Sequence, residues 1–135
     1  MRSPTLLAGV GLAIAVLAAA CNTEPVDGLS AETEFEVYET GSDIVVTITN
    51  ESNSAVAYRA CPSIWERQSN NDRVHGLQLC TDVITTVDAH SSVDVTYTFP
   101  VGQPLGSWRI VIPVGPSHDA AEIRTNEFEM VVTAE

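Results

Sequence analysis

The chain of 135 residues contains no lysine, and its six basic residues, all arginines, are set against 18 acidic residues. The formal net charge is −12 with the histidines neutral. Nucleic-acid affinity comes largely from lysine and arginine side chains that neutralise phosphates, so this balance excludes nucleic-acid binding. Anionic lipid headgroups are repelled for the same reason. Any attachment to a membrane must therefore use something other than a basic patch.

The sequence also lacks an N-terminal apolar stretch long enough to span a bilayer. The uncharged run over residues 6–20 has 15 residues, whereas a membrane-spanning helix needs about 20. The run follows the basic residue Arg2 and ends in small residues, which is the pattern of an export signal. We therefore interpret residues 1–20 as a signal peptide.

The end of this run, Leu17-Ala18-Ala19-Ala20-Cys21, resembles the lipobox of bacterial lipoproteins, with Ala18 in place of the commoner leucine. The resemblance implies cleavage before Cys21 and a diacylglycerol on its thiol. Two acyl chains hold a protein stably on a membrane. The mature protein is then lipid-anchored in the bacterial cell envelope, facing the periplasm or the exterior. The alternative is an ordinary secretory signal that leaves Cys21 as a plain cysteine.

Removal of the signal leaves about the commonest length for a single domain. Residues 22–32 contain Pro25 and Gly28 and show no apolar periodicity, so we predict that residues 21–32 are the lipidated cysteine and a flexible tether. Fully extended, this tether reaches roughly 36 Å at about 3.3 Å per residue. The folded domain is predicted to occupy residues 33–135.

Only three cysteines are present, and assigning Cys21 to the anchor leaves Cys61 and Cys80. Disulfides persist outside the cytoplasm, and a bridge that closes about 20 residues stabilises a fold by roughly 3 kcal/mol. The alternative is a metal or redox pair, but the chain has no Cys-x-x-Cys and no short Cys/His spacing typical of zinc sites. We predict a structural disulfide and no cofactor.

No segment of the mature chain has a convincing helical period, whereas alternation of apolar and polar residues dominates it. Weaker strands are predicted at residues 55–60, 64–68 and 77–83, and clusters of Asn, Asp, Ser and Gly separate the segments. Seven to eight short strands in this length predict an all-β antiparallel sandwich. The predicted inward rows are Phe35 and Val37; Ile44, Val46 and Ile48; Val93, Val95, Tyr97 and Phe99; Trp108, Ile110 and Ile112; and Phe128, Met130 and Val132.

Three motifs carry a family resemblance: Thr47-Ile48-Thr49-Asn50-Glu51-Ser52, the turn Asp88-Ala89-His90-Ser91-Ser92, and Gly106-Ser107-Trp108-Arg109-Ile110. Over about residues 35–132 the chain resembles bacterial immunoglobulin-like domains and, more distantly, the intracellular proteinase inhibitor (BsuPI-type) domain. The turn departs from the pattern because Ala89-His90 replaces the usual Pro-Gly. The short spacing of Cys61 and Cys80 predicts a local bridge and not an antibody-type bridge between sheets. The resemblance implies an immunoglobulin-like fold, which hosts many unrelated functions.

Catalytic and metal-binding patterns are weak. Asp88, His90 and Ser91 are adjacent only within a predicted turn, and the chain has no Gly-x-Ser-x-Gly elbow. Blue copper needs Cys, two His and usually Met, but the mature chain has only Met130, in an alternating strand. Neither Asp88 nor the Asn70-Asn71-Asp72 segment belongs to a calcium-binding ladder of acidic residues. We expect no enzyme activity and no metal.

Trp108 is in phase with Ile110 and is predicted to be core, but either face of Trp65 could be inward. If Trp65 points outward, it forms a candidate contact surface with Arg59 and Arg67, because Trp and Arg are enriched at binding hot spots. The sequence thus favours a non-enzymatic binding or envelope-structural module with a protein partner. The alternatives are a proteinase inhibitor acting through a rigid loop at residues 62–73, and an accessory subunit of an envelope complex.

Overall fold

The computed structural model describes residues 28–76, 80, 85–115 and 121–132, and these residues form an all-β fold of eleven strands. The strands are β1 (Leu29–Thr33), β2 (Val37–Glu39), β3 (Asp43–Asn50), β4 (Val56–Tyr58), β5 (Ile64–Arg67), β6 (Arg73–His75), β7 (Thr85–Val87), β8 (Ser91–Thr98), β9 (Gly106–Pro113), β10 (Glu122–Arg124) and β11 (Phe128–Val131). Within these ranges there is no helix that is long and apolar enough to cross a membrane.

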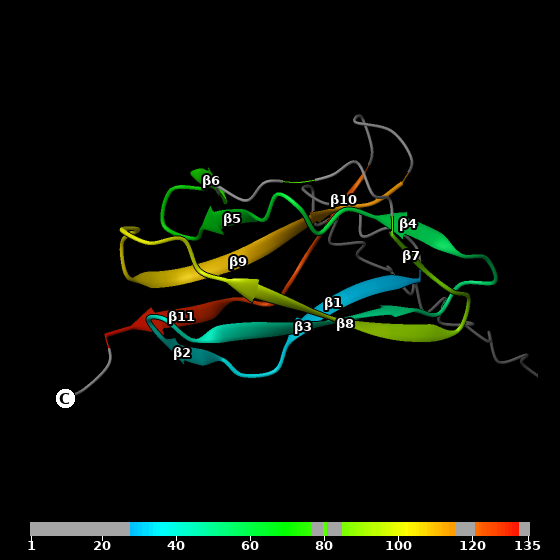
Figure 1. The fold of residues 1–135 in the computed structure, drawn as a ribbon, viewed down its shortest axis with the longest axis horizontal. Coiled ribbons are helices and arrows are strands. Elements are labelled where there is room, and N and C mark those ends of the chain that lie inside the picture. The colour runs from blue at the N-terminus through cyan, green and yellow to red at the C-terminus, as the bar shows by residue number, and fades with distance from the viewer. Residues whose placement is uncertain (1–27, 77–79, 81–84, 116–120, 133–135) are drawn as a thin grey trace, which may run out of the picture.

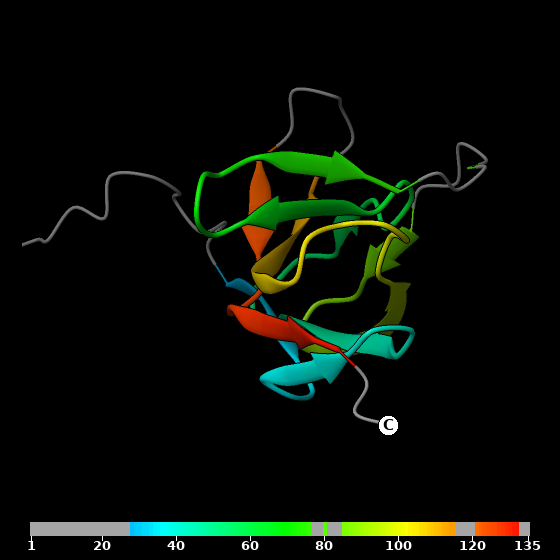
Figure 2. The same cartoon turned by 90° about the vertical axis from the view of Figure 1, so that its left-hand side faces the viewer.

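Two main sheets pack around one core. The first sheet has the order β1-β3-β8, and the second has the order β2-β11-β9-β5-β6, with β10 also paired to β9. Strands β4 and β7 form a separate short pair. The second sheet is strongly twisted, so that β5 and β6 lie along one side of the molecule while β11 and β2 lie near the first sheet (Figures 1 and 2). The predicted β-sandwich class is confirmed.

The longest strands have the predicted alternation. Ile44, Val46 and Ile48 on β3 are fully buried, and so are Ile110 and Ile112 on β9. Alternate side chains of a strand point to opposite faces, so each of these strands contributes one row to the shared core. The same alternation holds for β8, where Tyr97 is buried and Val93 and Val95 pack partly buried against the core.

The N-terminal boundary of the domain differs from the prediction. Residues Leu29–Thr33, expected in the tether, form β1 and pair with β3 from Leu29↔Asn50 to Thr33↔Val46. Leu29 and Ala31 are buried. Sequence reasoning missed this strand because only two apolar side chains, one of them a small alanine, mark its inward face. Six or seven residues then separate Cys21 from the domain, a reach of roughly 25 Å.

The predicted inward row of Phe35 and Val37 is wrong, because these side chains are 58% and 55% exposed. The inward residue of β2 is Tyr38, whose ring packs edge-on against Phe128 at 5.6 Å between centroids. Strand β2 has only three residues and pairs parallel with β11, which also departs from the wholly antiparallel prediction. Val132, expected inward, lies beyond the end of β11 and is 65% exposed.

Three further short strands, β6, β7 and β10, were not predicted, since three residues are too few to show a period. The predicted strand at 77–83 lies outside the described residues except for Cys80. A disulfide joins Cys61 to Cys80, with 5.7 Å between the Cα atoms. The predicted bridge is therefore present and closes the segment that contains β5 and β6.

A buried asparagine connects the end of β3 to two turns. Asn50 has no exposed surface. Its Nδ2 donates to the carbonyl oxygens of Ser54, Val87 and Asp88 at 2.9, 3.1 and 3.2 Å. Its Oδ1 accepts from the backbone N–H and the hydroxyl of Ser52 at 3.0 and 2.6 Å. These bonds explain physically why Asn and Ser occur at this spacing after the strand.

Asn50→Ala is expected to lower the free energy of unfolding by about 1–2 kcal/mol, because it leaves buried backbone groups without partners. Urea unfolding followed by circular dichroism measures the change. The matched control is Asn53→Ala in the same turn, which removes only an exposed hydrogen bond to His90 and should change the value by less than about 0.5 kcal/mol. Equal effects of both substitutions contradict the role given to Asn50.

Candidate functional site

The predicted contact surface of Arg59, Trp65 and Arg67 is not formed, because Trp65 points inward and is fully buried. Its indole packs edge-on against the rings of Phe99 and Phe128 at centroid distances of 5.2 and 6.2 Å. The indole Nε1 donates to the buried hydroxyl of Ser63 at 2.9 Å. Trp65 is therefore a core residue. Arg59 and Arg67 consequently lack the exposed tryptophan that the predicted contact surface required.

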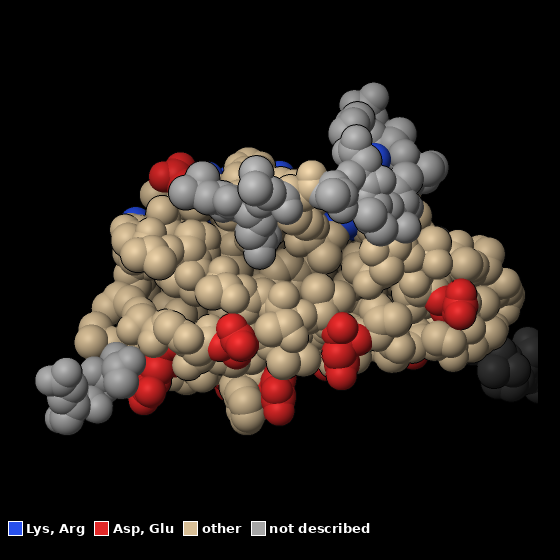
Figure 3. All heavy atoms as spheres, in the orientation of Figure 1, with Lys and Arg blue, Asp and Glu red and all other residues tan. Residues whose placement is uncertain are grey.

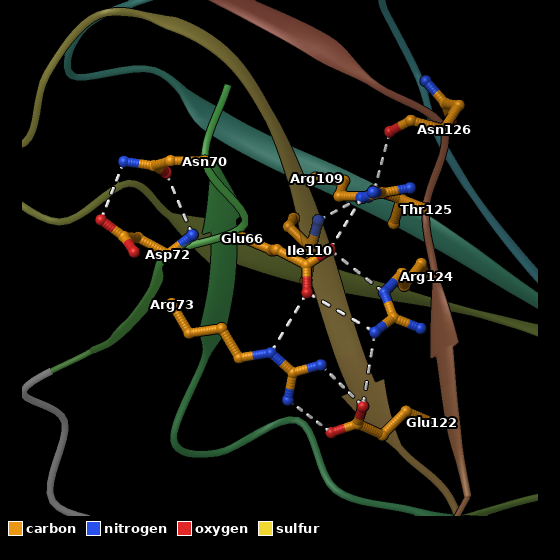
Figure 4. Close-up of polar contacts among 10 residues, drawn as sticks. All are labelled: Glu66, Asn70, Asp72, Arg73, Arg109, Ile110, Glu122, Arg124, Thr125 and Asn126. Atoms are coloured by element: carbon orange, nitrogen blue, oxygen red, sulfur yellow. Dashed lines mark hydrogen bonds and ion pairs between the residues drawn. The ribbon is translucent and has the colours of Figure 1, made fainter. Parts of the chain in front are cut away.

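The burial of Trp65 places the next residue, Glu66, on the outer face of the second sheet. In register with Glu66 are Arg73 on β6 and Arg109 on β9. Residues paired in adjacent strands present their side chains on the same face. Arg124 on β10 approaches from the far side of β9 (Figure 4). Four strands thus bring three arginines to one carboxylate.

Glu66 is only 4% exposed, and each arginine donates to it through Nε. Arg73 donates to Oε2 at 3.1 Å, while Arg109 and Arg124 donate to Oε1 at 3.0 and 3.2 Å. Arg73 also holds Glu122 with two parallel bonds of 2.8 Å, the bidentate geometry that suits a guanidinium and a carboxylate. The dashed lines in Figure 4 trace this network.

The pKa values of both carboxyl groups reflect the surrounding arginines. Burial raises the pKa of Glu66, but hydrogen bonds and charge from Arg124, with contributions from Arg73 and Arg109, outweigh it and leave the pKa below its ordinary value. The hydrogen bonds from Arg73 chiefly lower the pKa of Glu122. Both groups are therefore ionised at neutral pH, and the cluster of three arginines and two glutamates carries one net positive charge.

Arg109 has unused donors. Its Nε bonds to Glu66, but its two Nη amines have no acceptor among the described residues. The side chain retains 27% of its surface exposed. A guanidinium fixed at one nitrogen and open at the other two is oriented for a further carboxylate or similar anion. We call the outer surface that carries Arg73, Arg109 and Arg124 with Glu66 and Glu122 the arginine face.

The outer face of the first sheet has the opposite charge. Glu32, Thr47 and Asp94 lie in register across β1, β3 and β8, and Asp43 lies two rows away. Between described residues, every ion pair joins an arginine of the arginine face to Glu66 or Glu122. We call the outer surface that carries Glu32, Asp43 and Asp94 the acidic face. Among the described residues these three carboxylates have no basic partner. Figure 3 shows acidic side chains along the lower side of the molecule, while basic side chains, with an acidic one at the upper left, are visible along the upper side.

Within the described residues, His90 and Ser91 of the 88–92 turn bond to other groups. His90 Nε2 lies 2.8 Å from Asn53 Oδ1, and the Ser91 hydroxyl donates to the carbonyl of Ala89, so the two do not bond to each other. In the 70–72 turn, Asn70 and Asp72 hydrogen-bond each other. Within the part of the chain that the structure describes, no group of three His, Cys, Asp or Glu could hold a metal. Cys21 and His118 lie outside the described residues.

Sequence reasoning did not find the cluster, because its five residues lie between positions 66 and 124 on four strands. One usable signal existed. Trp65 and Glu66 are neighbours on a strand, so an inward tryptophan requires an outward glutamate. The arginines opposite that glutamate depend on the pairing register, which single-sequence patterns do not give.

No protein-family model matches this sequence, and no curated protein sequence matches it. Among solved structures, the chain is similar to the reeler domain of human F-spondin, with a TM-score of 0.45 and 13% identity over 82% of this chain and 91% of that one. It is also similar to Spo0M, a sporulation control protein from Bacillus subtilis, with a TM-score of 0.43 and 13% identity over 82% and 51%. A mutant β-glucosidase from Listeria innocua gives 0.33 and 16% over 74% and 16%. At these scores the likeness carries no conclusion about function.

Proposed function

We propose that this chain is an exported, lipid-anchored, immunoglobulin-like domain without enzymatic activity, which binds an anionic partner in the bacterial envelope through its arginine face. The observation that carries the proposal is the state of Arg109. Its guanidinium is fixed by the buried Glu66 and leaves two Nη amines without an acceptor among the described residues. The chain has a net charge of −12, whereas the arginine cluster carries a net positive charge. The cluster is therefore a local site for an anionic group on an otherwise acidic protein.

Physical considerations favour binding over a purely structural network. Arginine is enriched at binding hot spots, and a side chain already held in position loses less conformational freedom when a partner arrives. Electrostatic complementarity of this kind gives specificity and fast association more than raw affinity. The contacts that the arginine face makes with its partner are therefore expected to weaken at high salt, near 1 M.

The proteinase-inhibitor alternative stays a second proposal, and its candidate loop at residues 62–73 is mostly strand and turn. The segment at residues 62–73 contains all of β5 and begins β6, and its tryptophan is part of the core. What remains between these strands is a short turn, in which the N–H of Asn71 donates to the carbonyl of Arg67 at 2.8 Å. An accessory subunit of an envelope complex, by contrast, is one form of the binding function proposed here.

Binding is tested by photo-crosslinking in native membranes, with a benzophenone amino acid at His75, an exposed residue beside Arg73 on the same face. A crosslinked partner is expected in the parent protein and should fall at least tenfold in Arg109→Glu. The matched control, Arg67→Glu, makes the same change of charge on the opposite face of β5, where Arg67 is in register with the buried Trp108, and should leave the crosslink unchanged. Loss in both variants, or in neither, contradicts binding through the arginine face.

The anchor is tested separately with Cys21→Ser. The wild-type protein should sediment with membranes, and the variant should be found in the soluble exported fraction, because it lacks the thiol that carries the lipid. Incorporation of labelled fatty acid into the wild type alone provides the chemical control. A variant that still sediments with membranes after a high-salt wash shows that attachment does not depend on this cysteine.

A further inference from the structure

We propose that the anionic partner of the arginine face is the acidic face of a second copy of this chain, so that anchored copies associate side by side. This inference rests on the proposed function and names the partner of the same surface. It is carried by three observations: the complementary charges of the two faces, their matching geometry, and their position relative to the N-terminal end.

The two faces carry opposite charges, and on each of them a charged side chain has atoms without an ionic partner among the described residues. On the arginine face, the Nη amines of Arg109 lack an acceptor among the described residues. On the acidic face, Glu32 has no ion pair there, and Asp94 accepts only the hydroxyl of Thr47, at 2.8 Å. Each face therefore supplies what the other lacks.

The spacing of the charges also matches. Arg73 and Arg109 lie on the two strands that flank β5, while Glu32 and Asp94 lie on the two strands that flank β3. Adjacent strands are about 4.8 Å apart, so both pairs are separated by about 10 Å across their sheets. Two sheets that pack face to face, about 10 Å apart, can bring one pair opposite the other.

The position of the two faces suits copies that are anchored in one membrane. They lie on opposite sides of the molecule (Figures 2 and 3). Leu29, where the tether joins, lies beside Asn50 at one end of the eight-residue strand β3. When the domain is anchored through this end, the arginine face and the acidic face both point sideways and are accessible to neighbouring copies. Contact between two different faces can repeat from copy to copy, and it produces open rows or closed rings according to the rotation between neighbours.

The net charge makes this association dependent on salt in both directions. At low ionic strength the overall negative charges of two copies repel over a long range, with a Debye length of about 30 Å at 0.01 M. Near 0.15 M the length falls to about 8 Å, so distant repulsion is screened while contacts at the interface persist. At 1 M salt the contacts are screened as well. Association is therefore expected to be greatest at intermediate salt, and to need the high local concentration of the membrane.

The experiment uses the full-length lipidated protein in its native membrane. Because the chain has no lysine, amine-directed crosslinkers are ineffective, and a benzophenone amino acid replaces Thr96, an exposed residue of β8 on the acidic face. The expected result is a ladder of dimers and larger species, with crosslinked peptides from β5, β6 or β9. A monomer band alone overturns the inference.

A charge exchange then tests the pairing of the faces. Arg109→Glu and Asp94→Arg, each expressed alone, should reduce the ladder at least tenfold because each places like charges opposite each other. When the two variants are co-expressed with different tags, crosslinks should return between the tags, because every mixed contact is again complementary. Crosslinks within one tag should stay absent. Failure of the mixture to restore crosslinks overturns the pairing of Arg109 with Asp94.

The outcomes separate this inference from the proposed function. If Arg109→Glu abolishes the crosslink made from His75 while Asp94→Arg leaves it intact, the arginine face binds a different partner, and self-association is wrong. If neither variant affects any crosslink, both proposals are wrong. Membrane levels and unfolding temperatures of each variant show that it is folded, and Asp94→Arg changes an exposed side chain, so at least one arm does not depend on the buried cluster.

Discussion

Trp65→Ala is expected to lower the free energy of unfolding by about 3–5 kcal/mol, the range measured for large aromatic residues in protein cores. The indole is fully buried and makes edge-to-face contacts with Tyr97, Phe99 and Phe128. Its removal leaves a cavity between the two sheets and takes away the donor that bonds Ser63. Domains of this size are stable by about 5–15 kcal/mol, so the variant loses a large part of its stability.

Urea unfolding of the non-lipidated Cys21→Ser protein, followed by circular dichroism, measures this loss. The control is Val101→Ala, a deletion of apolar atoms from a side chain that is 98% exposed, and it should change stability by less than about 0.5 kcal/mol. Trp65→Phe should be intermediate, because a smaller ring keeps part of the packing. A Trp65→Ala protein as stable as the control contradicts a core position.

Glu66→Gln is expected to lower the free energy of unfolding by about 2–3 kcal/mol at pH 7. Breaking a fully buried ion pair by removing one partner costs about 3–5 kcal/mol, and the arginines here are partly exposed, between 17% and 34%, which reduces the cost. The neutral amide leaves three guanidinium groups close together with one fewer negative charge. The substitution also frees Arg109 from its fixed orientation, so crosslinking through the arginine face should fall with it.

The pH dependence gives this prediction a second readout. The pKa of Glu66 is lowered in the folded state, so its stabilising contribution is complete above the ordinary pKa of about 4.5 and is lost as the pH falls through the lower folded value. The difference in unfolding free energy between the wild type and Glu66→Gln should therefore be constant above about pH 5 and shrink below pH 4.5. Glu129→Gln, at an exposed position on β11, serves as the control for the loss of one carboxylate. A pH-independent difference contradicts the ion-pair explanation.

The strands that the sequence identified correctly are the long ones. Over the eight residues of β3 or β9, alternation is repeated often enough to determine which side chains are inward. Strands of three residues, such as β6 and β10, contain less than two full periods and take their conformation from pairing with a neighbour. Strand β1 was missed for a related reason, since Ala31 is a weak apolar signal and its burial depends on the position of β3.

The candidate site was the least accessible to prediction. A tryptophan beside two arginines suggested an exposed surface at residues 59–67, but the aromatic core around Trp65 turns that side chain inward. Its neighbour Glu66 then has to be outward. Of the three arginines that bond Glu66, Arg73 comes from the neighbouring strand of the chain, whereas Arg109 and Arg124 come from strands more than 40 residues further along. No local pattern contains that information.

The sequence by itself determined the β-sandwich class, the cysteine pair that is bridged, the inward rows of the long strands and the negative overall charge, because each depends on composition or on a period of two residues. It also predicts export and the lipid anchor at Cys21, which lies outside the described residues. Only the tertiary structure decided where the charges lie. The pairing register of β5, β6 and β9, set by the packing of the core, brings the arginines together around Glu66. The carboxylates on the opposite face have no arginine partner among the described residues.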